Sequence, residues 1–152
     1  MTQKNRITAT DRANAGHVCA CFNLRKATRV VTQLYDEALK PAGLRSTQFA
    51  VLAATRALGP VSVNQLAEWI VMDRTTLTRN LKPLERDGLI AVRAGDDLRV
   101  RQVSLTAKGR KTLERAYPMW ESVQARLREE LGDARVDQML VDLKATVEGL
   151  QS

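Results

Sequence analysis

The sequence predicts a mainly α-helical domain that carries one small β-hairpin, and three observations predict it. Apolar residues recur at helical spacing in six segments. Two short runs rich in β-branched residues flank a turn-rich gap in the second half. The chain has 152 residues, of which 44% are hydrophobic, which is enough to bury one core. Helices followed by a hairpin in this order are typical of an α+β winged helix.

The first two helices are expected over roughly residues 18–39 and 47–58. The first has apolar residues at alternating four- and three-residue spacings, which place them on one side. These residues are Ala20, Leu24, Ala27, Val31, Leu34 and Ala38. Pro41 and Gly43 are expected to end this helix. Ser46 is the expected N-cap of the second, which is nearly all apolar and is therefore predicted to be buried on most sides.

The next two helices are short and close together. Ser62 and Gln65 have the spacing of a capping box at the start of one helix. Asp73 is the natural N-cap of the following helix, which Asp87 and Gly88 end. Since only one or two residues separate the pair, the segment is a helix-turn-helix candidate.

The second helix of this pair has two different faces. Leu77, Leu81 and Leu84 recur at helical spacing and are predicted to be buried. The opposite face is rich in threonine, a mediocre helix former, and in cations, so an ordinary solvated face is a less economical explanation. Pro83 removes a backbone hydrogen bond to the carbonyl of Arg79 and is expected to bend the helix or end its regular part.

The strands are expected at Leu89–Arg93 and Val100–Leu105, and they must lean on the helices because an isolated hairpin is unstable. Thr106 begins a long helix to about Leu131, and a last helix spans residues 135–150. Both again have apolar residues at alternating three- and four-residue spacing. We expect the first and last helices to pack on a second copy of the chain. The alternative is that both ends fold back on their own domain.

The net charge of +7 favours a polyanionic partner. Residues 72–111 contain ten Lys/Arg and five Asp/Glu, whereas residues 112–152 contain five and eight, so the centre is basic and the end mildly acidic. The chain lacks a signal-peptide pattern and a long apolar run, and it has two cysteines, so a cytoplasmic location is expected. It has one histidine, no Gly-rich phosphate loop and no nucleophile motif, so no enzyme is expected.

Three segments share a pattern with one known family: the upstream helix "LRSTQFAVL", the run "DRTTLTRNLKPLERDGLI", and Asp97-x-Arg99 followed by "VSLTAKG". They resemble the core of the MarR family, the multiple-antibiotic-resistance-type regulators. The resemblance extends from about residue 17 to the end of the chain. It implies a homodimeric winged helix-turn-helix regulator whose recognition helix enters the major groove and whose wing reaches the neighbouring minor groove.

The resemblance also implies how the chain is divided. A MarR-type domain is expected over residues 17–150, with a DNA-binding lobe at 44–111 and dimerisation helices at 17–40 and 112–150. Residues 1–16 are expected to be a flexible tail. The implied partner is double-stranded DNA with a pseudo-palindromic operator. The expected function is a sequence-specific repressor released by a small aromatic or anionic effector.

Hydroxyl and guanidinium groups explain why particular residues would contact DNA. Short hydroxyls let a helix approach a groove, and arginine can hold a guanine bidentately. Arg99 is expected in the minor groove with Asp97 orienting it through a charge-assisted bond, and Leu98 stands where relatives often carry arginine. The expected DNA-contacting residues are Ser62, Asn64, Arg74, Thr75, Thr76, Thr78, Arg79, Lys82, Arg93, Asp97, Arg99 and Arg101.

Two alternatives stay open. Cys21 precedes Tyr35 by fourteen residues, which is similar to the organic-hydroperoxide-resistance branch, where a tyrosine at that spacing holds a reactive thiolate. Cys19 is the second candidate of a redox mechanism, although Arg25 replaces a further tyrosine of that branch and both thiols could be unreactive. The second alternative, of another class, is a winged-helix module that binds protein rather than DNA.

No cofactor or metal is expected. His17 and the two cysteines hint at a metal site, but the sequence offers no fourth ligand. Trp69, Tyr117, Met119 and Trp120 are candidates for lining an effector cavity. Such residues at helical spacing are more often simply part of a core.

Overall fold

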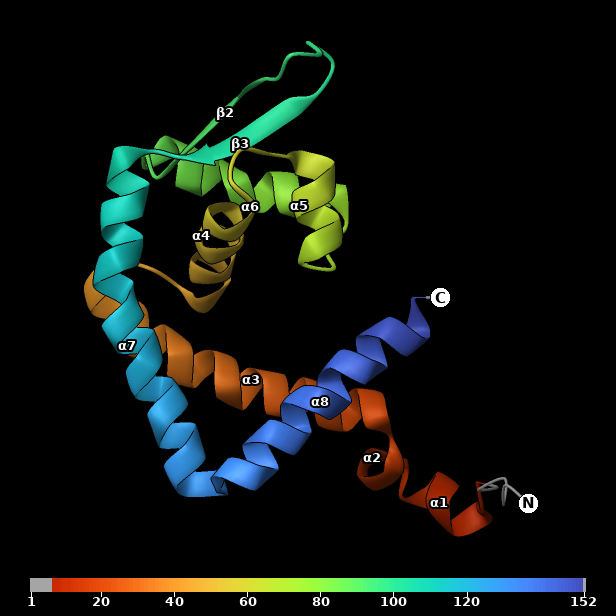
Figure 1. Cartoon of the computed structure of the whole chain (residues 1–152). Coiled ribbons are helices and arrows are strands. Elements are labelled where there is room, and N and C mark those ends of the chain that lie inside the picture. The colour runs from red at the N-terminus through yellow and green to blue at the C-terminus, as the bar shows by residue number, and fades with distance from the viewer. Residues whose placement is uncertain (1–6, 152) are drawn as a thin grey trace. The chain divides into compact units, whose positions relative to one another are not determined.

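The computed structural model describes residues 7–151 (Figure 1). It is mainly helical, with a small antiparallel sheet, and the expected fold class is confirmed. The chain divides into two compact units, residues 1–34 and residues 35–152. The expected flexible tail lies partly outside the described residues. Among its described residues the tail contains a short helix, α1 (Ala9–Ala13), which Thr8 caps, and the start of a second, α2 (Ala15–Val18).

The α3 helix (Ala20–Leu39) continues into a 3-10 turn, η1 (Lys40–Ala42), which ends at Gly43 in the left-handed region with φ 74°. The α4 helix (Ser46–Leu58) follows. The prediction that Ser46 caps this helix is wrong, because Ser46 is its first residue. Its backbone N–H donates instead to Asp36 Oδ1 at 2.7 Å, so a side chain of α3 satisfies the end of α4.

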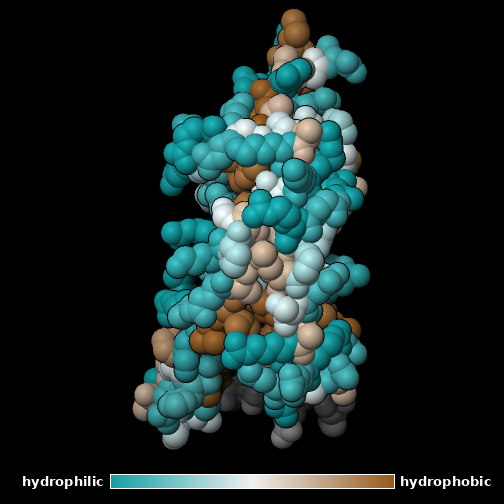
Figure 2. Space-filling model, turned by 90° about the vertical axis from the view of Figure 1, so that its left-hand side faces the viewer, coloured by the Kyte–Doolittle hydropathy of each residue, from teal (hydrophilic) through white to brown (hydrophobic). Residues whose placement is uncertain are grey.

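The core is built by α4, α5 (Val63–Trp69), α6 (Arg74–Arg86) and the sheet. The β2 strand (Ile90–Ala94) pairs with β3 (Arg101–Leu105), and β3 also pairs with β1 (Val61–Ser62). The strand order is therefore β1-β3-β2. The third strand was not predicted, because two residues are too few for an alternating pattern. The β2–β3 hairpin is the wing, and Figure 2 shows an apolar group at its upper tip within a hydrophilic surface.

The α7 helix (Ala107–Leu131) is held close to the start of the wing. Thr106 is its N-cap, and the Thr106 hydroxyl also donates to the Gly88 carbonyl at 2.6 Å. Gly109 lies so close to Leu89 that a Cβ atom there would stand 1.9 Å from the Leu89 carbonyl oxygen. This position therefore requires glycine for a close approach of two backbones. The "LTAKG" sequence thus joins α7 to the wing.

The α8 helix (Asp133–Leu150) completes the chain and leaves most of its apolar side chains exposed. Val136 is buried, whereas Leu140, Leu143 and Val147 are between 40% and 51% exposed.

Among residues 7–151, no helix is both long and apolar enough to cross a membrane. The expectation that Pro83 ends the regular part of α6 is wrong, because the helix continues beyond this residue to Arg86, and a bend at Pro83 stays a prediction.

Candidate nucleic-acid interface

The α6 helix is positioned by its first residue and by its leucines. The Asp73 carboxylate accepts the backbone N–H of Thr76 at 2.8 Å, as the N-cap prediction requires. Hydrogen bonds from the side chain and backbone of Thr76 hold the pKa of the Asp73 carboxyl below its usual value. Leu77, Leu81 and Leu84 are at most 4% exposed and fix the rotation of the helix on the core. The opposite face is therefore turned to solvent.

The turn between α5 and α6 contains a feature that the sequence analysis missed. Val71 has φ 55°, in the left-handed region that β-branched residues rarely adopt. Its backbone N–H donates to the Glu68 carbonyl, and the N–H of Met72 donates to Ala67, so the turn is tightly bonded. The sequence offers one signal for this conformation: only one or two residues separate the two predicted helices, so the chain must reverse direction within them. Glycine would be the usual choice there.

Three cations of α6 and three of the wing have no ion-pair partner among the described residues. Ion pairs within residues 7–151 involve Arg56, Arg86, Arg126, Arg128 and Lys144. Six exposed cations outside these pairs form what we call the cationic surface. They are Arg74, Arg79 and Lys82 on α6, and Arg93, Arg99 and Arg101 on the wing. The α6 helix and β2 lie against each other in the same lobe, so this surface spans both elements.

Two of the hydroxyls that we expected to face DNA already have partners. The Thr78 hydroxyl donates to the Arg74 carbonyl at 2.8 Å, within its own helix. The Ser62 hydroxyl donates to Gln65 Oε1 and accepts the Gln65 backbone N–H, which is the predicted capping box. Both oxygens keep acceptor capacity, but their protons are committed. Thr75 and Asn64 are exposed, and Thr76 is half-buried.

The wing tip is a bonded turn. Val100 N–H donates to the Asp97 carbonyl at 2.9 Å, and Gly95 N–H donates to the Val100 carbonyl at 2.8 Å. Asp97 Oδ1 accepts the backbone N–H of Arg99 at 2.9 Å. The expected bond from Asp97 to the Arg99 guanidinium is therefore replaced by a bond to its backbone. Asp97 shapes the turn, and the Arg99 side chain extends freely from it.

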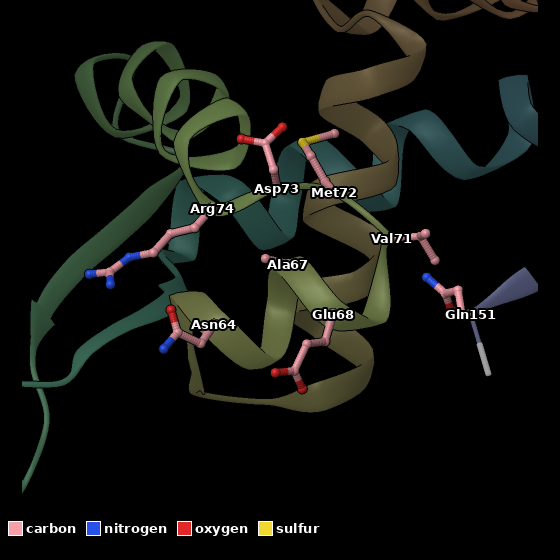
Figure 3. A pocket seen from close by; sticks show the side chains of 8 residues that line it. All are labelled: Asn64, Ala67, Glu68, Val71, Met72, Asp73, Arg74 and Gln151. Carbon is pink, nitrogen blue, oxygen red and sulfur yellow. The ribbon is translucent and has the colours of Figure 1, made fainter.

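An open groove of about 470 Å³ lies beside the turn of the helix-turn-helix (Figure 3). Its wall comes from α5, the turn, the start of α6 and the residue after α8. The lining residues are Asn64, Ala67, Glu68, Val71, Met72, Asp73, Arg74 and Gln151. Two expected DNA-contacting residues, Asn64 and Arg74, thus share a border with two carboxylates, so this groove has no single charge preference.

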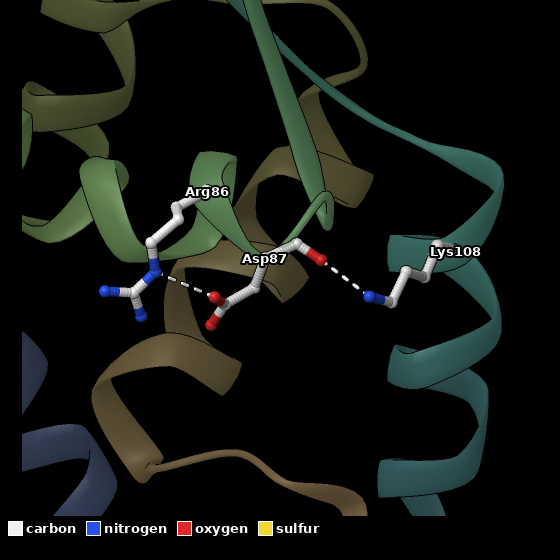
Figure 4. Close-up of polar contacts among 3 residues, drawn as sticks. All are labelled: Arg86, Asp87 and Lys108. Carbon is white, nitrogen blue, oxygen red and sulfur yellow. Dashed lines mark hydrogen bonds and ion pairs between the residues drawn. The ribbon is translucent and has the colours of Figure 1, made fainter.

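The C-terminal end of α6 is attached to α7. Arg86 pairs with the Asp87 carboxylate at 3.0 Å, and Lys108 Nζ donates to the Asp87 carbonyl at 2.7 Å (Figure 4). In Figure 4, Asp87 lies between Arg86, which contacts its carboxylate, and Lys108, which contacts its backbone carbonyl. Arg86 and Lys108 therefore belong to the same basic region but already have partners, in contrast to the cations of the cationic surface.

Cys19, Cys21 and Tyr35 are the residues that the redox alternative would use. Cys19 and Cys21 are exposed and free. The Tyr35 hydroxyl accepts a hydrogen bond from Gln124 at 2.6 Å, and burial raises the pKa of this tyrosine. Within residues 7–151, no group of three His, Cys, Asp or Glu side chains could hold a metal ion.

The candidates for lining an effector cavity are partly buried at the core, except for Trp69. Tyr117 and Trp120 pack on Phe49, with ring centroids 5.9 and 6.2 Å apart, and join the edge of the core with Met119. Trp69 is 58% exposed at the end of α5. The simpler reading as core residues therefore applies to three of the four.

Known proteins share both the sequence and the arrangement. A family model described as "MarR family" matches residues 44–100. Over 126 residues, 83% of this chain and 84% of the relative, the chain is 30% identical to an uncharacterized HTH-type transcriptional regulator of Bacillus cereus. The chain belongs to the MarR family. The similarity to the uncharacterized regulator YwoH of Bacillus subtilis is 32% over 91 residues, which are 60% of this chain and 66% of that protein, just under two thirds of its length.

This MarR-family chain is also similar in structure to a solved transcriptional regulator. It is similar to the transcriptional regulator MosR of M. tuberculosis, solved in complex with DNA, with 43% identity and a TM-score of 0.77. The match covers 88% of this chain and 99% of MosR. Membership in the family confirms the expectation of a transcriptional regulator rather than an enzyme.

Proposed function

We propose that this MarR-family chain binds double-stranded DNA in a sequence-specific way and represses transcription until a small effector releases it. The observation that carries the proposal is the cationic surface, whose six side chains have no carboxylate partner among the described residues. Phosphate groups would supply the missing counter-charges. The DNA complex of the similar regulator MosR supports the same choice of partner.

The division of roles within the surface follows from its geometry. The α6 helix presents Arg79 and Lys82 beside exposed threonines, which suits base edges and phosphates in a major groove. Arg93 and Arg101 are on opposite faces of the wing, since Arg93 pairs with Gln102 and Arg101 pairs with Ala94 in the β-ladder. A wing with a cation on each face suits a groove with a phosphate backbone on each side.

The proposed assembly is a homodimer. Exposed apolar residues at helical spacing on α8 (Leu140, Leu143 and Val147) need a cover, and a second copy of the chain would provide it. We therefore propose residues 44–111 as the DNA-binding lobe and residues 17–40 and 112–150 as dimerisation helices of one domain over residues 17–150. Two copies would meet a pseudo-palindromic operator with half-sites about 34 Å apart.

The effector would bind near α6. A cavity of about 250 Å³ lies between α4 and α6, small for a ligand site and suited only to a small molecule. Its lining residues are Arg45, Thr47, Gln48, Val51, Asn80, Pro83 and Leu84. Arg45 supports an anionic ligand, and contact with the second half of α6 would let an occupant shift that helix. The thiol-based alternative has less support, because Cys19 and Cys21 are exposed and the Tyr35 hydroxyl accepts its hydrogen bond from Gln124.

The test is a duplex-binding titration over a range of salt concentrations. The duplex is first selected by the wild-type chain from a randomised pool. We expect affinity to fall steeply with salt, and Arg79→Ala and Arg99→Ala each to weaken binding by about tenfold or more. Arg126→Ala is the matched control, because this arginine is already paired with Glu130 at 2.7 Å on α7. It should change affinity by less than about twofold.

Two results would count against the proposal. Undiminished affinity in Arg79→Ala and Arg99→Ala, without salt dependence, would remove the cationic surface from the mechanism. A wild-type chain that selects no duplex and stays monomeric would instead favour a protein-binding winged-helix module.

A further inference from the structure

The tip of the wing carries an apolar side chain where solvent alone would favour a polar one. Leu98 is 82% exposed, and Val100, two residues later, is 37% exposed. The turn bond from Val100 N–H to the Asp97 carbonyl places Leu98 and Arg99 at the two central positions, the outermost points of the turn. Figure 2 shows hydrophobic atoms at the upper end of the molecule, where the wing ends, next to hydrophilic atoms.

The same turn is built to present these two side chains rather than to bury them. Asp97 bonds the Arg99 backbone N–H through its carboxylate and accepts Val100 N–H through its carbonyl. Gly95 N–H closes the loop on the Val100 carbonyl. Three hydrogen bonds of 2.8–2.9 Å therefore hold a six-residue connection, so little conformational entropy remains to be lost when the tip meets a partner.

The cations around Leu98 identify the kind of partner. Arg99 is its neighbour in the turn, and Arg93 and Arg101 lie in the last two ladder pairs before the turn, on opposite faces of the hairpin. A lipid surface or an apolar protein groove would meet this tip from one side only. Cations on both faces fit a narrow cleft with negative charge along both walls, and the minor groove of DNA has that geometry.

We propose that Leu98 is a specificity-determining residue that disfavours G·C base pairs in the minor groove beneath the wing tip. This inference rests on the proposed function. In the minor groove a G·C pair presents the guanine N2 amino group, a donor that A·T pairs lack. An apolar leucine pressed against that donor displaces its water and offers no acceptor, which leaves the amino group unsatisfied. Over an A·T pair the groove has no such donor, so the same leucine meets only the acceptors A N3 and T O2 and the sugars.

The cationic neighbour does a different job in the same turn. The Arg99 guanidinium adds electrostatic attraction, which depends on salt and is strongest where the minor groove is narrow. Leu98 adds no charge, so its effect is independent of salt and appears only as a choice between base pairs. The two residues can therefore be separated by experiment although they are adjacent.

The experiment uses the full-length chain and a randomised duplex pool, followed by titration of selected duplexes with A·T or G·C at the wing-contacted step. The variants are Leu98→Asn, which keeps the size of the side chain and supplies an acceptor for guanine, and Leu98→Ala, which removes most of the side chain. Arg99→Ala is the matched comparison. Thermal unfolding of each variant checks that the exposed turn tolerates the change.

We expect the wild-type chain to prefer A·T at this step by about tenfold. Leu98→Asn and Leu98→Ala should reduce the preference to near unity, with the half-site read by α6 and the salt slope unchanged. Arg99→Ala should lower affinity and the salt slope, which falls by about one unit for a lost phosphate contact. The inference is wrong if the wild-type chain shows no preference for A·T at the wing-contacted step, or if both Leu98 variants keep that preference. In either case the proposed DNA binding would still stand. A wild-type chain that selects no duplex overturns the proposed function as well.

Discussion

The cationic surface differs from the α7–α8 arm in how some of its charged residues are partnered. On the arm, Arg128 is paired with Asp137 at 2.9 Å and with Asp133 at 3.3 Å, and these carboxylates raise the pKa of its guanidinium. On α6 and the wing, six cations have no such partner among the described residues. Charge that is neutralised locally serves the fold, whereas charge left unpaired on one surface repels itself and becomes favourable only when a polyanion binds.

Apolar residues show the converse difference. The leucines of α6 are buried in their own lobe, so that helix is complete within one chain. The α8 helix exposes Leu140, Leu143 and Val147, so it is incomplete within one chain. One region thus lacks a partner for its charges and the other lacks a partner for its apolar side chains. Two different partners, DNA and a second copy, would satisfy them separately.

The largest expected effect is on the proposed dimer interface of the α7–α8 arm. Leu140→Glu replaces a side chain that we propose to be buried between two copies, and a two-fold interface loses the contact twice. Full burial of one leucine contributes about 1.5–3 kcal/mol, so the dimer should weaken by at least about a hundredfold. Sedimentation equilibrium measures the dissociation constant.

Val141→Glu is the matched control, because Val141 is 60% exposed but lies on the other side of α8. It should leave the dimer largely intact. Equal association of the wild-type chain and Leu140→Glu would show that the arm does not form the interface.

The next largest effect is expected at the contact between α7 and Leu89, at the start of the wing. Gly109→Ala would place a methyl group 1.9 Å from the Leu89 carbonyl oxygen, which is backbone and cannot turn aside. The free energy of unfolding should fall by about 3 kcal/mol, measured by denaturant titration. Gly149→Ala, on α8, has no atom within 4 Å of the added carbon and should be neutral or slightly stabilising. A fully stable Gly109→Ala variant would mean that the contact between α7 and Leu89 is loose.

The smallest expected effect is on the free energy of unfolding, at Val71 in the turn of the helix-turn-helix. Val71 holds φ 55°, a conformation that costs a non-glycine residue about 1–2 kcal/mol. Val71→Gly removes that cost but adds freedom to the unfolded chain, so we expect a net gain of about 1 kcal/mol in the free energy of unfolding. The same change in a regular helix, Val141→Gly, should lower it. Loss of stability in Val71→Gly would indicate that the valine side chain contributes packing that its 52% exposure does not suggest.

Local rules predicted much of the fold and of the candidate site. The caps at Ser62, Asp73 and Thr106 lie within three residues of the N–H groups that they accept, so the sequence contains both partners. The stop at Gly88 and the buried leucine face of α6 follow from the same short spacings. The exposed face of α6 was predictable because a helix with one buried face has only one direction left for its cations.

The tertiary structure alone decided the features that join distant residues. Ser46 is bonded to Asp36 across a turn, β1 pairs with β3 about forty residues later, and Gly109 meets the Leu89 carbonyl. None of these pairs has a periodic signature, since each depends on where two elements meet after folding. The sequence by itself determined which faces would be buried, capped or charged, because those choices are made within one turn of helix. Whether a cation meets a carboxylate, or a third strand joins the hairpin, depends on chain closure over long distances, and only the folded chain decides it.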